Sequence, residues 1–350
     1  MNLSALCEAI KTEAQRLGFT HSGIAPALPV PHLQTFLEWV EKGCHADMGY
    51  LEREDTLAKR KDPRLILEDC QRIICLALPY QPPEAELGDR PPGKGRVSAY
   101  AVTRDYHQII WEKLSQLETF IRAEAGENVR LKSYVDTGPI LERSYASLAG
   151  IGTIGKNACL IIQGSGSYFF LAEILTDLRL PVDAPFTRDL CGACRRCIEA
   201  CPTGCILPDR TIDAGRCISY LTIENKGEIP DDLKPKIGDW VFGCDLCQMV
   251  CPHNARAQEG TTSNGELLPP EFIDLASLFS FDEGAFRKRF GPTPLSRTKR
   301  NGLLRNAAVV LGNQHHTNAL PVLEKALEKE TDPKVLNACH WAITQMIKEC

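Results

Sequence analysis

Two cysteine-proline runs carry the clearest chemical signal in the chain. They read Cys191-x-x-Cys194-x-x-Cys197-x-x-x-Cys201-Pro202 and Cys244-x-x-Cys247-x-x-x-Cys251-Pro252. Steps of two residues let three consecutive thiolates bind three corners of a cubane iron–sulfur cluster. The proline ends the local helix, and the fourth cysteine turns to another cluster. The second run lacks one cysteine, which Cys217 can supply. The pattern predicts two [4Fe-4S] clusters and a role in electron transfer.

The eight cysteines divide into two sets because the last cysteine of each run ligates the other cluster. We assign cluster 1 to Cys191, Cys194, Cys197 and Cys251, and cluster 2 to Cys201, Cys217, Cys244 and Cys247. Structural zinc sites also use Cys-x-x-Cys pairs, but they do not call for three cysteines at two-residue steps before Cys-Pro. Disulfides are disfavoured because nothing marks the chain as secreted. Cys205 has no partner in this pattern, and we expect it to be a small buried side chain.

Composition narrows the class of protein. The 350 residues suffice for two or three domains, and 43% hydrophobic with 24% charged residues is ordinary for a globular protein. The first residues resemble neither a signal peptide nor a twin-arginine signal, and no apolar run approaches the ~20 residues that span a bilayer. Sixteen cysteines then indicate a reducing compartment, so we expect a cytoplasmic protein without a membrane partner. The net charge of −5 still allows a local basic patch.

The segment before the cysteine runs predicts an α/β (or α+β) domain over residues 1–179. Apolar periodicity predicts helices at 4–17, 31–43, 106–125 and 142–149, and strands at 72–79 and 131–135. Residues 82–95, rich in proline and glycine, predict a loop. Residues 158–163 and 167–176 predict a hairpin across a Gly-Ser-Gly turn.

Two further domains are predicted after this one. A bacterial ferredoxin-like two-cluster module covers 180–258, and a helical region covers 259–350. Helices are expected at 302–311, 319–328 and 333–347, where two stretches look like copies of one helical unit. That similarity fits a HEAT-like repeat, and a plain helical subdomain is the alternative.

Two residues of the first domain are placed to do acid–base or ligand chemistry. Asp136 ends the predicted strand 131–135, and carboxylates at strand ends in α/β sheets often point into the ligand crevice. A catalytic acid and a turn or helix cap are equally consistent with this position. His107 opens the predicted helix 106–125, where it either faces a metal or, more simply, caps and packs.

A glycine-rich turn follows at Gly150-Ile-Gly152-Thr-Ile-Gly155-Lys156-Asn157. It is not a dinucleotide fingerprint, because a helix rather than a strand precedes it, nor a phosphate loop, because Asn157 replaces Ser or Thr. A turn that lets the backbone approach a bulky cofactor is the better interpretation.

A basic stretch lies in the C-terminal region of this acidic chain. Its members are Arg287, Lys288, Arg289, Arg297, Lys299, Arg300 and Arg305. Phe286 and Phe290 interleave with the first of them, as is typical of surfaces that bind a phosphate backbone. A solvated basic loop is the alternative, because such runs are common on surfaces.

Taken together, these motifs resemble the epoxyqueuosine reductase family from about residue 45 to the C-terminal helices. The residues that carry the resemblance are Tyr100, Arg104-Asp-Tyr-His107, Val135-Asp-Thr-Gly-Pro139, Gly155-Lys-Asn157, Cys191-Gly-Ala-Cys194, Arg216-Cys-Ile-Ser-Tyr-Leu221 and Gly243-Cys-Asp-Leu-Cys-Gln-Met-Val-Cys-Pro252. The cysteine runs occur in many ferredoxin-like proteins. Their combination with Asp-Thr-Gly-Pro and Gly-Lys-Asn is far more specific.

The resemblance implies a cofactor and a substrate that composition does not reveal. Cobalamin would lie between the first domain and the two-cluster module, and the reaction would reduce epoxyqueuosine in the tRNA wobble position to queuosine, the final step of queuosine biosynthesis. Asp136 would then be the proton donor. The implied cobalamin pocket comprises Arg64, His107, Asp136, Lys156, Asn157 and Ser219. The basic stretch and the helical repeats would hold the anticodon stem-loop, an external low-potential donor would supply electrons, and the chain would act as a monomer.

Two alternatives come from other functional classes. A cobalamin-dependent reductive dehalogenase would share the core, but such enzymes usually carry a twin-arginine signal and have no need of a basic helical tail. A ferredoxin-type electron-transfer subunit would leave Asp136 and about half of the chain without a role. The axial ligand of cobalt stays open between His107 and no protein ligand.

Overall fold

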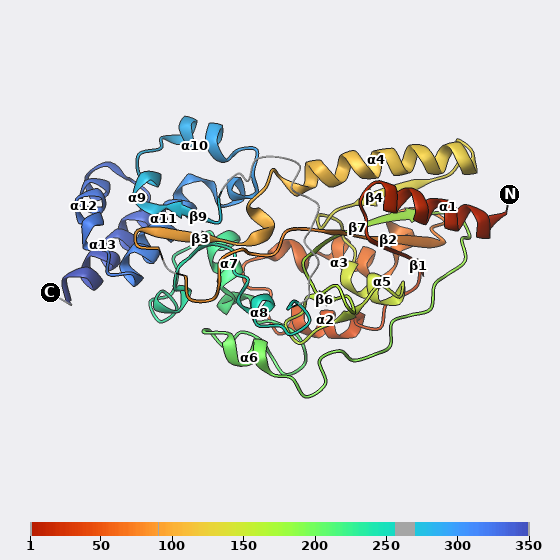
Figure 1. The fold of residues 1–350 in the computed structure, drawn as a ribbon, viewed down its shortest axis with the longest axis horizontal. Coiled ribbons are helices and arrows are strands. Elements are labelled where there is room, and N and C mark those ends of the chain that lie inside the picture. The colour runs from red at the N-terminus through yellow and green to blue at the C-terminus, as the bar shows by residue number, and fades with distance from the viewer. Residues whose placement is uncertain (1, 90, 256–269, 349–350) are drawn as a thin grey trace.

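The computed structural model describes residues 2–89, 91–255 and 270–348. Figure 1 shows an elongated molecule whose N- and C-termini lie at opposite ends. A four-stranded sheet with its helices occupies the N-terminal end, and the last three helices form the C-terminal end. Within the described ranges, no helix combines the length and apolar character that crossing a membrane requires.

The four-stranded sheet is antiparallel throughout. Its order is β1 (His21–Pro26), β2 (Arg72–Pro79), β7 (Phe169–Thr176), β4 (Leu131–Tyr134). Each neighbouring pair runs antiparallel, so this half is α+β rather than a parallel, doubly wound α/β sheet. The predicted strands at 72–79 and 131–135 are confirmed, but the parallel-sheet crevice invoked for Asp136 is not the one that this sheet has.

Helices cover both faces of this sheet, which is why β2 is an unbroken apolar run. They are α1 (Leu3–Arg16), α2 (Leu33–Glu41), α4 (Tyr106–Ala125) and α5 (Glu142–Leu148), whereas α3 (Glu54–Lys61) packs on the 3-10 turn Pro63–Leu65. On one face α1 and α4 bury Ile10 and Leu114 against Ile74 and Ile174. On the other, α5 buries Tyr145. The helix predictions at 4–17, 31–43, 106–125 and 142–149 are confirmed within two residues.

A second sheet of three strands joins segments that are far apart in sequence. Its order is β8 (Trp240–Phe242), β3 (Lys94–Val97), β9 (Phe272–Asp274), parallel on one side and antiparallel on the other. The predicted loop 82–95 therefore ends inside a strand. The sheet also ties residues of the first predicted domain to residues of the other two, and the three-domain division stays a prediction.

The predicted hairpin of 158–163 with 167–176 is wrong. Residues 160–161 form β6 (Leu160–Ile161), which pairs with β5 (Thr153–Ile154), and a single bridge joins Ile162 to Gly166. Strand β7 instead lies between β2 and β4 in the large sheet. Its length explains this, because a two-residue partner cannot pair the backbone groups of an eight-residue strand.

Short helices follow within or just after the cysteine runs, and the C-terminal region is helical. The short helices are α6 (Arg196–Ala200), α7 (Ile218–Ile223) and α8 (Leu246–Met249). The C-terminal helices are α9 (Leu275–Leu278), α10 (Glu283–Phe290), α11 (Lys299–Asn313), α12 (Leu320–Lys329) and α13 (Pro333–Lys348). The three predicted helices correspond to α11–α13. Residues 256–269 of the predicted segments lie outside the described ranges.

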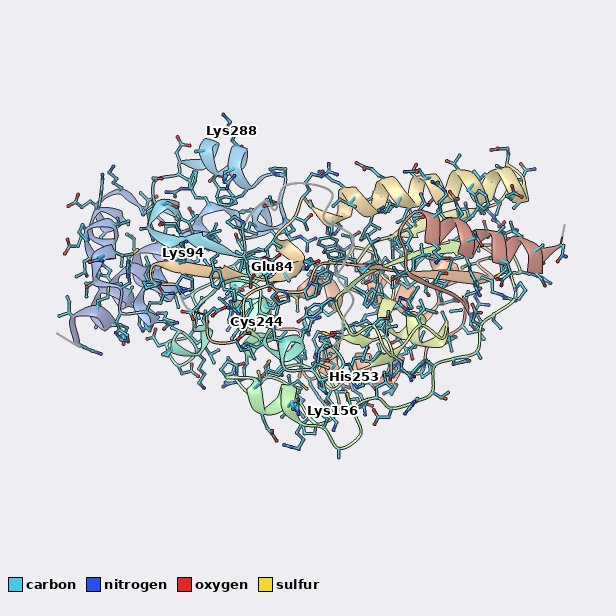
Figure 2. The ribbon with its side chains drawn as sticks, viewed as in Figure 1. Glu84, Lys94, Lys156, Cys244, His253 and Lys288 are labelled. Carbon is cyan, nitrogen blue, oxygen red and sulfur yellow. The ribbon has the colours of Figure 1, made fainter. Side chains whose placement is uncertain are left out.

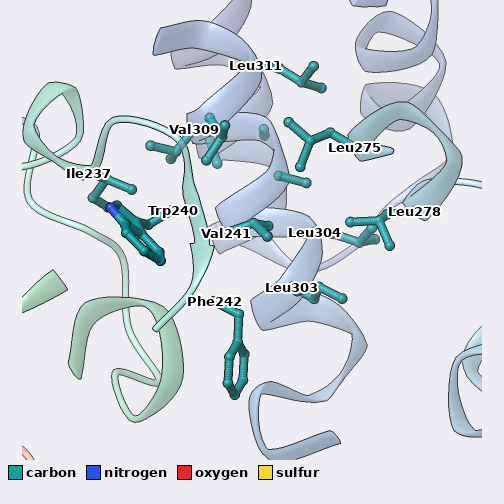
Figure 3. Close-up of a cluster of buried hydrophobic side chains, with 14 of the residues drawn as sticks. Ile237, Trp240, Val241, Phe242, Leu275, Leu278, Leu303, Leu304, Val309 and Leu311 are labelled. Carbon is teal, nitrogen blue, oxygen red and sulfur yellow. The ribbon is translucent and has the colours of Figure 1, made fainter. Parts of the chain in front are cut away.

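Helix α11 is the centre of the largest core. Figure 3 shows its Leu303, Leu304 and Val309 beside Val241 of β8 and Leu275 of α9. On the opposite side α11 packs closely on α13, because a Cβ atom at Gly312 would lie 2.7 Å from the Trp341 ring. A helical C-terminal region is thus established, and its HEAT-like character stays a prediction.

Candidate active site

A large cavity lies between α2, α5 and the residues before and after the first cysteine run. Its volume is about 700 Å³, within the range of cofactor and ligand pockets. Phe36 and Trp39 give it an apolar wall, and Arg60, Arg143 and Arg210 give it cationic groups. The lining also includes Asp136 and Glu142. A smaller cavity shares these two carboxylic acids and is otherwise mostly aromatic.

Asp136 lies where β4 ends, with a φ of 44° that is unusual for a residue other than glycine. Its side chain is 38% exposed and receives two hydrogen bonds from α4. The Tyr106 hydroxyl donates to one carboxylate oxygen, and His107 Nε2 lies 2.8 Å from the other. The turn thus presents the Asp136 carboxylate at the cavity wall, where Tyr106 and His107 can donate to it.

Arg297 brings the C-terminal region to this carboxylate. Its Nη2 lies 3.2 Å from the Tyr106 hydroxyl and 3.9 Å from an Asp136 carboxylate oxygen. The guanidinium also stacks over the Tyr106 ring, with 5.5 Å between its central carbon and the ring centroid. Burial and the Asp136 carboxylate raise the pKa of Tyr106, which keeps the phenol protonated.

Two carboxylates favour the protonated form of His107, although the Arg297 guanidinium, with Nη2 2.8 Å from Nε2, opposes it. Its Nδ1 lies 2.7 Å from Asp105 Oδ1, while Nε2 faces Asp136. Burial opposes the charged form, but the hydrogen bonds to the two carboxylates outweigh it and raise the His107 pKa to about 9. Both ring nitrogens are therefore engaged, which leaves neither one to ligate a metal.

This shift predicts a loss of stability with rising pH. The His107 pKa is higher in the folded chain, about 9, than its ordinary value of 6.5. Its contribution, on the order of 3 kcal/mol, is complete below pH 6.5 and is lost as the pH rises through 9. We expect the melting temperature of wild type to fall over this interval more steeply than that of His107→Gln. Parallel curves for the two proteins would contradict the assignment.

The cysteines assigned to cluster 1 surround one small cavity. Its lining includes Cys191, Cys194, Cys197 and Cys251. These four thiols are half-buried, and the face they share continues to the surface through Arg196 and His253. The structure therefore brings together the four residues that the spacing predicts for this cluster.

The cysteines assigned to cluster 2 lie deeper. Burial and the neighbouring thiols of Cys217 and Cys201 raise the pKa of Cys244 well above its ordinary value. Cys247 contacts Cys159 and lies near Cys244 and Cys217. Cys205 is buried, as expected, but its sulfur lies only 3.5 Å from that of Cys201. In residues 2–89, 91–255 and 270–348, no three His, Cys, Asp or Glu side chains are arranged around a single metal ion. A cubane cluster instead places each thiolate on a different iron.

The residues predicted for the cobalamin pocket lie in several different surroundings, and their assignment to cobalamin stays a prediction. Of that set only Asp136 lines the large cavity. Arg64 is exposed and paired with Asp62, and the Ser219 backbone amide interacts with the Cys217 thiol. His107 is not part of the large cavity's lining but contacts Asp136, which is.

Lys156 and Asn157 belong to the cysteine module instead. Lys156 Nζ donates to the carbonyls of Gly192 and Cys194, at 2.7 and 2.9 Å. Asn157 is buried and lines the cavity of the four cluster 1 cysteines. Figure 2 shows Lys156 and His253 close to α6. The glycine-rich turn is thus pressed against the cysteine-bearing loop, and Gly152 approaches the Ile161 carbonyl too closely to allow a Cβ atom.

The basic stretch divides into three environments. Arg287, Lys288, Arg289 and Lys299 are exposed, and Figure 2 places Lys288 at the outer edge of α10. Arg297 faces Asp136, as described above.

The last two residues of that stretch are structural, and the phosphate-binding interpretation of Arg305 is corrected. Arg305 is only 2% exposed and donates to the carbonyls of Leu221 and Asn225, so it cannot reach a phosphate. Arg300 is largely buried in an ion pair with Glu330. Sequence cannot separate these roles, because charge alone does not show which side chains the fold buries.

Sequence reasoning missed several residues of the site. They are Tyr106, Arg297 as a partner of Asp136, Arg60, Glu142 and Glu173. A buried strand interrupted by one acid was a usable signal for Glu173, because Phe-Phe-Leu-Ala-Glu-Ile-Leu-Thr is otherwise almost wholly apolar.

Two family models match the chain. One described as "Epoxyqueuosine reductase QueG, DUF1730" matches residues 60–137, and one described as "4Fe-4S double cluster binding domain" matches residues 190–254. The epoxyqueuosine reductase of Pseudomonas aeruginosa is 39% identical over 345 residues, covering 97% of this chain and 94% of its own. That of Escherichia coli is 36% identical and covers 99% and 91%.

Solved structures give the same result. The epoxyqueuosine reductase from Streptococcus thermophilus superposes with a TM-score of 0.88 at 31% identity, over 98% of this chain and 90% of that one. An epoxyqueuosine reductase crystallised with an epoxyqueuosine-modified tRNA-Tyr stem loop gives 0.85 at 29% identity, over 99% and 100%. The mixed architecture with a double-cluster domain is therefore shared over nearly the whole chain.

Proposed function

The chain belongs to the epoxyqueuosine reductase family, and from that premise we propose that it reduces epoxyqueuosine in a tRNA anticodon to queuosine, the final step of queuosine biosynthesis. One observation of the molecule carries this proposal. Asp136, backed by His107 and Tyr106, lines a large cavity close to the double-cluster segment. That arrangement brings a proton source and an electron source to one cavity.

The chemistry requires both sources. Removing the epoxide oxygen as water consumes two electrons and two protons. An alkoxide is a poor leaving group, so an acid must protonate the oxygen as the carbon–oxygen bond breaks. Asp136 takes that role, and His107 stores a proton 2.8 Å from its carboxylate. Arg297 and the Tyr106 hydroxyl hold the carboxylate in place. The aromatic residues around Asp136 limit the entry of bulk water.

The lining of the large cavity fits a cobalamin. Arg60 Nη1 is buried without a hydrogen-bond partner among the described residues, and Arg143 and Arg210 are nearby, which suits the phosphate and amide groups of that cofactor. Phe36 and Trp39 supply a flat apolar surface. Cobalamin supplies low-valent cobalt chemistry toward the epoxide that no side chain can perform. With both His107 nitrogens engaged, no His107 nitrogen is available to ligate cobalt.

The burial of the two cysteine sets supports a direction for electrons. Cys191, Cys194, Cys197 and Cys251 lie around a cavity that opens toward exposed residues such as Arg196. Cys244 and Cys247 are half-buried as well, but burial raises the pKa of Cys244, and contact with Cys159 together with burial raises that of Cys247, well above the ordinary value, which indicates a deeper position. Cluster 1 is therefore placed to receive electrons from an external low-potential donor, and cluster 2 to pass them inward.

The exposed cations of α10 are evidence for a tRNA-binding surface on this chain. A related reductase is known with a modified tRNA stem loop, and here α10, with α11–α13 as HEAT-like supports, carries the anticodon arm. The wobble base is recognised as an unstacked loop base, so no duplex has to be opened. We retain the monomer as a prediction.

Removing the exposed cations of α10 is expected to weaken tRNA binding, because their charge attracts the phosphate backbone. In a triple Arg287→Ala, Lys288→Ala, Arg289→Ala variant we expect affinity to fall at low salt. The slope of log K against log salt should be shallower by about two units, at roughly 0.7 per lost contact. Exposed cations of the N-terminal end, Arg16 and Lys132, are the matched control when changed to alanine. An unchanged slope in the triple variant would show that tRNA binds to another surface of the protein.

The direct test is anaerobic incubation of the reduced, fully loaded enzyme with epoxyqueuosine tRNA, followed by nucleoside mass spectrometry. Loss of one oxygen from the nucleoside supports the proposal, and an unchanged nucleoside overturns it. Turnover of haloorganic compounds instead would favour the dehalogenase alternative. A purified protein that carries clusters but binds no cobalamin would favour the electron-transfer subunit.

A further inference from the structure

A second pair of acids lies behind Asp136 and has no role in the mechanism so far. Glu173 on β7 is 0% exposed, and neither of its carboxylate oxygens has a hydrogen-bond partner among the described residues. Glu142, the first residue of α5, faces it, with one oxygen likewise unpartnered. Two carboxylates have no donor between them, so only a bound proton can join them. A buried pair of this kind is costly unless it holds protons.

Among the described residues, no Lys, Arg or His side chain forms an ion pair with Glu142 or Glu173. Glu173 has Cys75 of β2 and Tyr134 of β4 as its cross-strand neighbours, and neither is charged at neutral pH. The titratable groups that face the pair are Cys75, Tyr134, Asp136, Arg143 and Arg60. Burial and the Asp136 carboxylate raise the pKa of Glu142 to about 7, and burial and Glu142 raise that of Glu173 well above its ordinary value.

The pair communicates with Asp136 by two routes. The Glu142 carboxyl interacts with the backbone amide of Asp136, which helps to hold the left-handed conformation of that residue. Glu142 and Asp136 also line both of the cavities described above. A single water in such a polar site is enough to connect their carboxyl groups.

We propose that Glu142 and Glu173 are a buried proton store that supplies the second of the two protons consumed by epoxide reduction. This inference rests on the proposed function of the site. His107 supplies the first proton through Asp136. The acid pair then reprotonates the Asp136 carboxylate, which delivers the second proton. Glu142 is the donor of the pair, and Glu173 is a positioning residue because it acts only through Glu142.

The proton balance closes without another reagent. As the first carbon–oxygen bond breaks, Asp136 protonates the oxygen. Glu142 then transfers a proton through water to the Asp136 carboxylate, and the pair keeps one proton shared between two carboxyl groups. Asp136 protonates the hydroxyl as the second bond breaks, and water leaves. The two electrons come from the reductant through the clusters.

Glu142→Gln tests this store, because glutamine keeps the size and the contact with the Asp136 amide but releases no proton. We expect the single-turnover rate of oxygen loss to fall about 100-fold at pH 6 to 7. Wild type should lose rate with a midpoint near pH 7, and the variant should lack that step. A protonated-carboxyl band should disappear from the infrared spectrum of resting wild type on raising the pH from 6 to 8, but not from that of the variant.

Controls separate this inference from the function itself. Glu118→Gln alters another half-buried glutamate, bonded to Arg122 on α4, and should leave rate and pH profile unchanged. Glu173→Leu removes the carboxyl group whose hydrogen bond lowers the pKa of Glu142, and should shift the midpoint of the wild-type profile to higher pH; it also serves if Glu142→Gln does not fold. The proton store is overturned if the Glu142 and Glu173 variants both keep the wild-type pH profile. It is also overturned if Glu142→Gln loses rate equally at every pH and retains the wild-type midpoint. Wild type that removes no oxygen overturns the proposed function instead.

Discussion

Asp136→Asn is expected to abolish most turnover while leaving the fold intact. Asparagine is nearly isosteric and tolerates the positive φ at this position, so the turn after β4 should persist. Its single carbonyl oxygen can accept from only one of Tyr106 and His107, which bond to different oxygens of Asp136, and its amide has no acidic proton to give. We expect the single-turnover rate to fall by about 10²- to 10⁴-fold, the usual contribution of a general acid.

Measurements other than rate distinguish a lost acid from a damaged site. Iron content, cobalamin content and tRNA affinity of Asp136→Asn should equal those of wild type. The pKa of His107, followed by NMR, should fall because one of its carboxylate partners has lost its charge. A variant as active as wild type would show that another group protonates the epoxide.

Cys217→Ser is expected to eliminate cluster 2 and with it all turnover driven by an external reductant. Cys217 supplies the ligand that the second run lacks, and it is buried beside Cys201 and Cys244. A serine hydroxyl is a poor iron ligand compared with a thiolate, so roughly half of the bound iron should be lost. Iron and sulfide analysis with electron paramagnetic resonance of the reduced protein measures this.

Cys205→Ser is the matched control. Cys205 lies 3.5 Å from Cys201 and also contacts Cys217, so it is the residue most able to substitute as a ligand. With the predicted assignment, this variant keeps all of its iron and its reduced spectrum. If Cys205→Ser loses a cluster and Cys217→Ser does not, the fourth ligand of cluster 2 has been exchanged between them.

The parts of the site that sequence predicted well are those fixed over short distances along the chain. Steps of two residues place Cys191, Cys194 and Cys197 around one cavity whatever the rest of the fold does. Asp136 was found because it directly follows a strand. Helices such as α4 were found because their apolar period is local.

The parts that sequence missed depend on contacts between distant segments. Lys156 and Asn157 were expected at the cofactor, yet they hold the cysteine module, since only the fold shows which surface the glycine-rich turn presses against. Arg297 and Arg305 belong to one basic stretch, but one reaches Asp136 and the other is buried. Strand β3 was hidden in a proline- and glycine-rich loop because both of its partners lie far away in sequence.

The three-stranded sheet also limits the order in which parts of the protein can assemble during synthesis. During synthesis β3 leaves the ribosome long before β8, and the cysteines from Cys191 to Cys217 are made in between. The last three cluster ligands, Cys244, Cys247 and Cys251, lie between β8 and β9. Until those segments arrive, β3 is an unpaired edge, the kind of strand that aggregates in slowly folding chains. Cluster loading and closure of this sheet therefore share one late interval, and cells short of iron should accumulate the chain as insoluble protein.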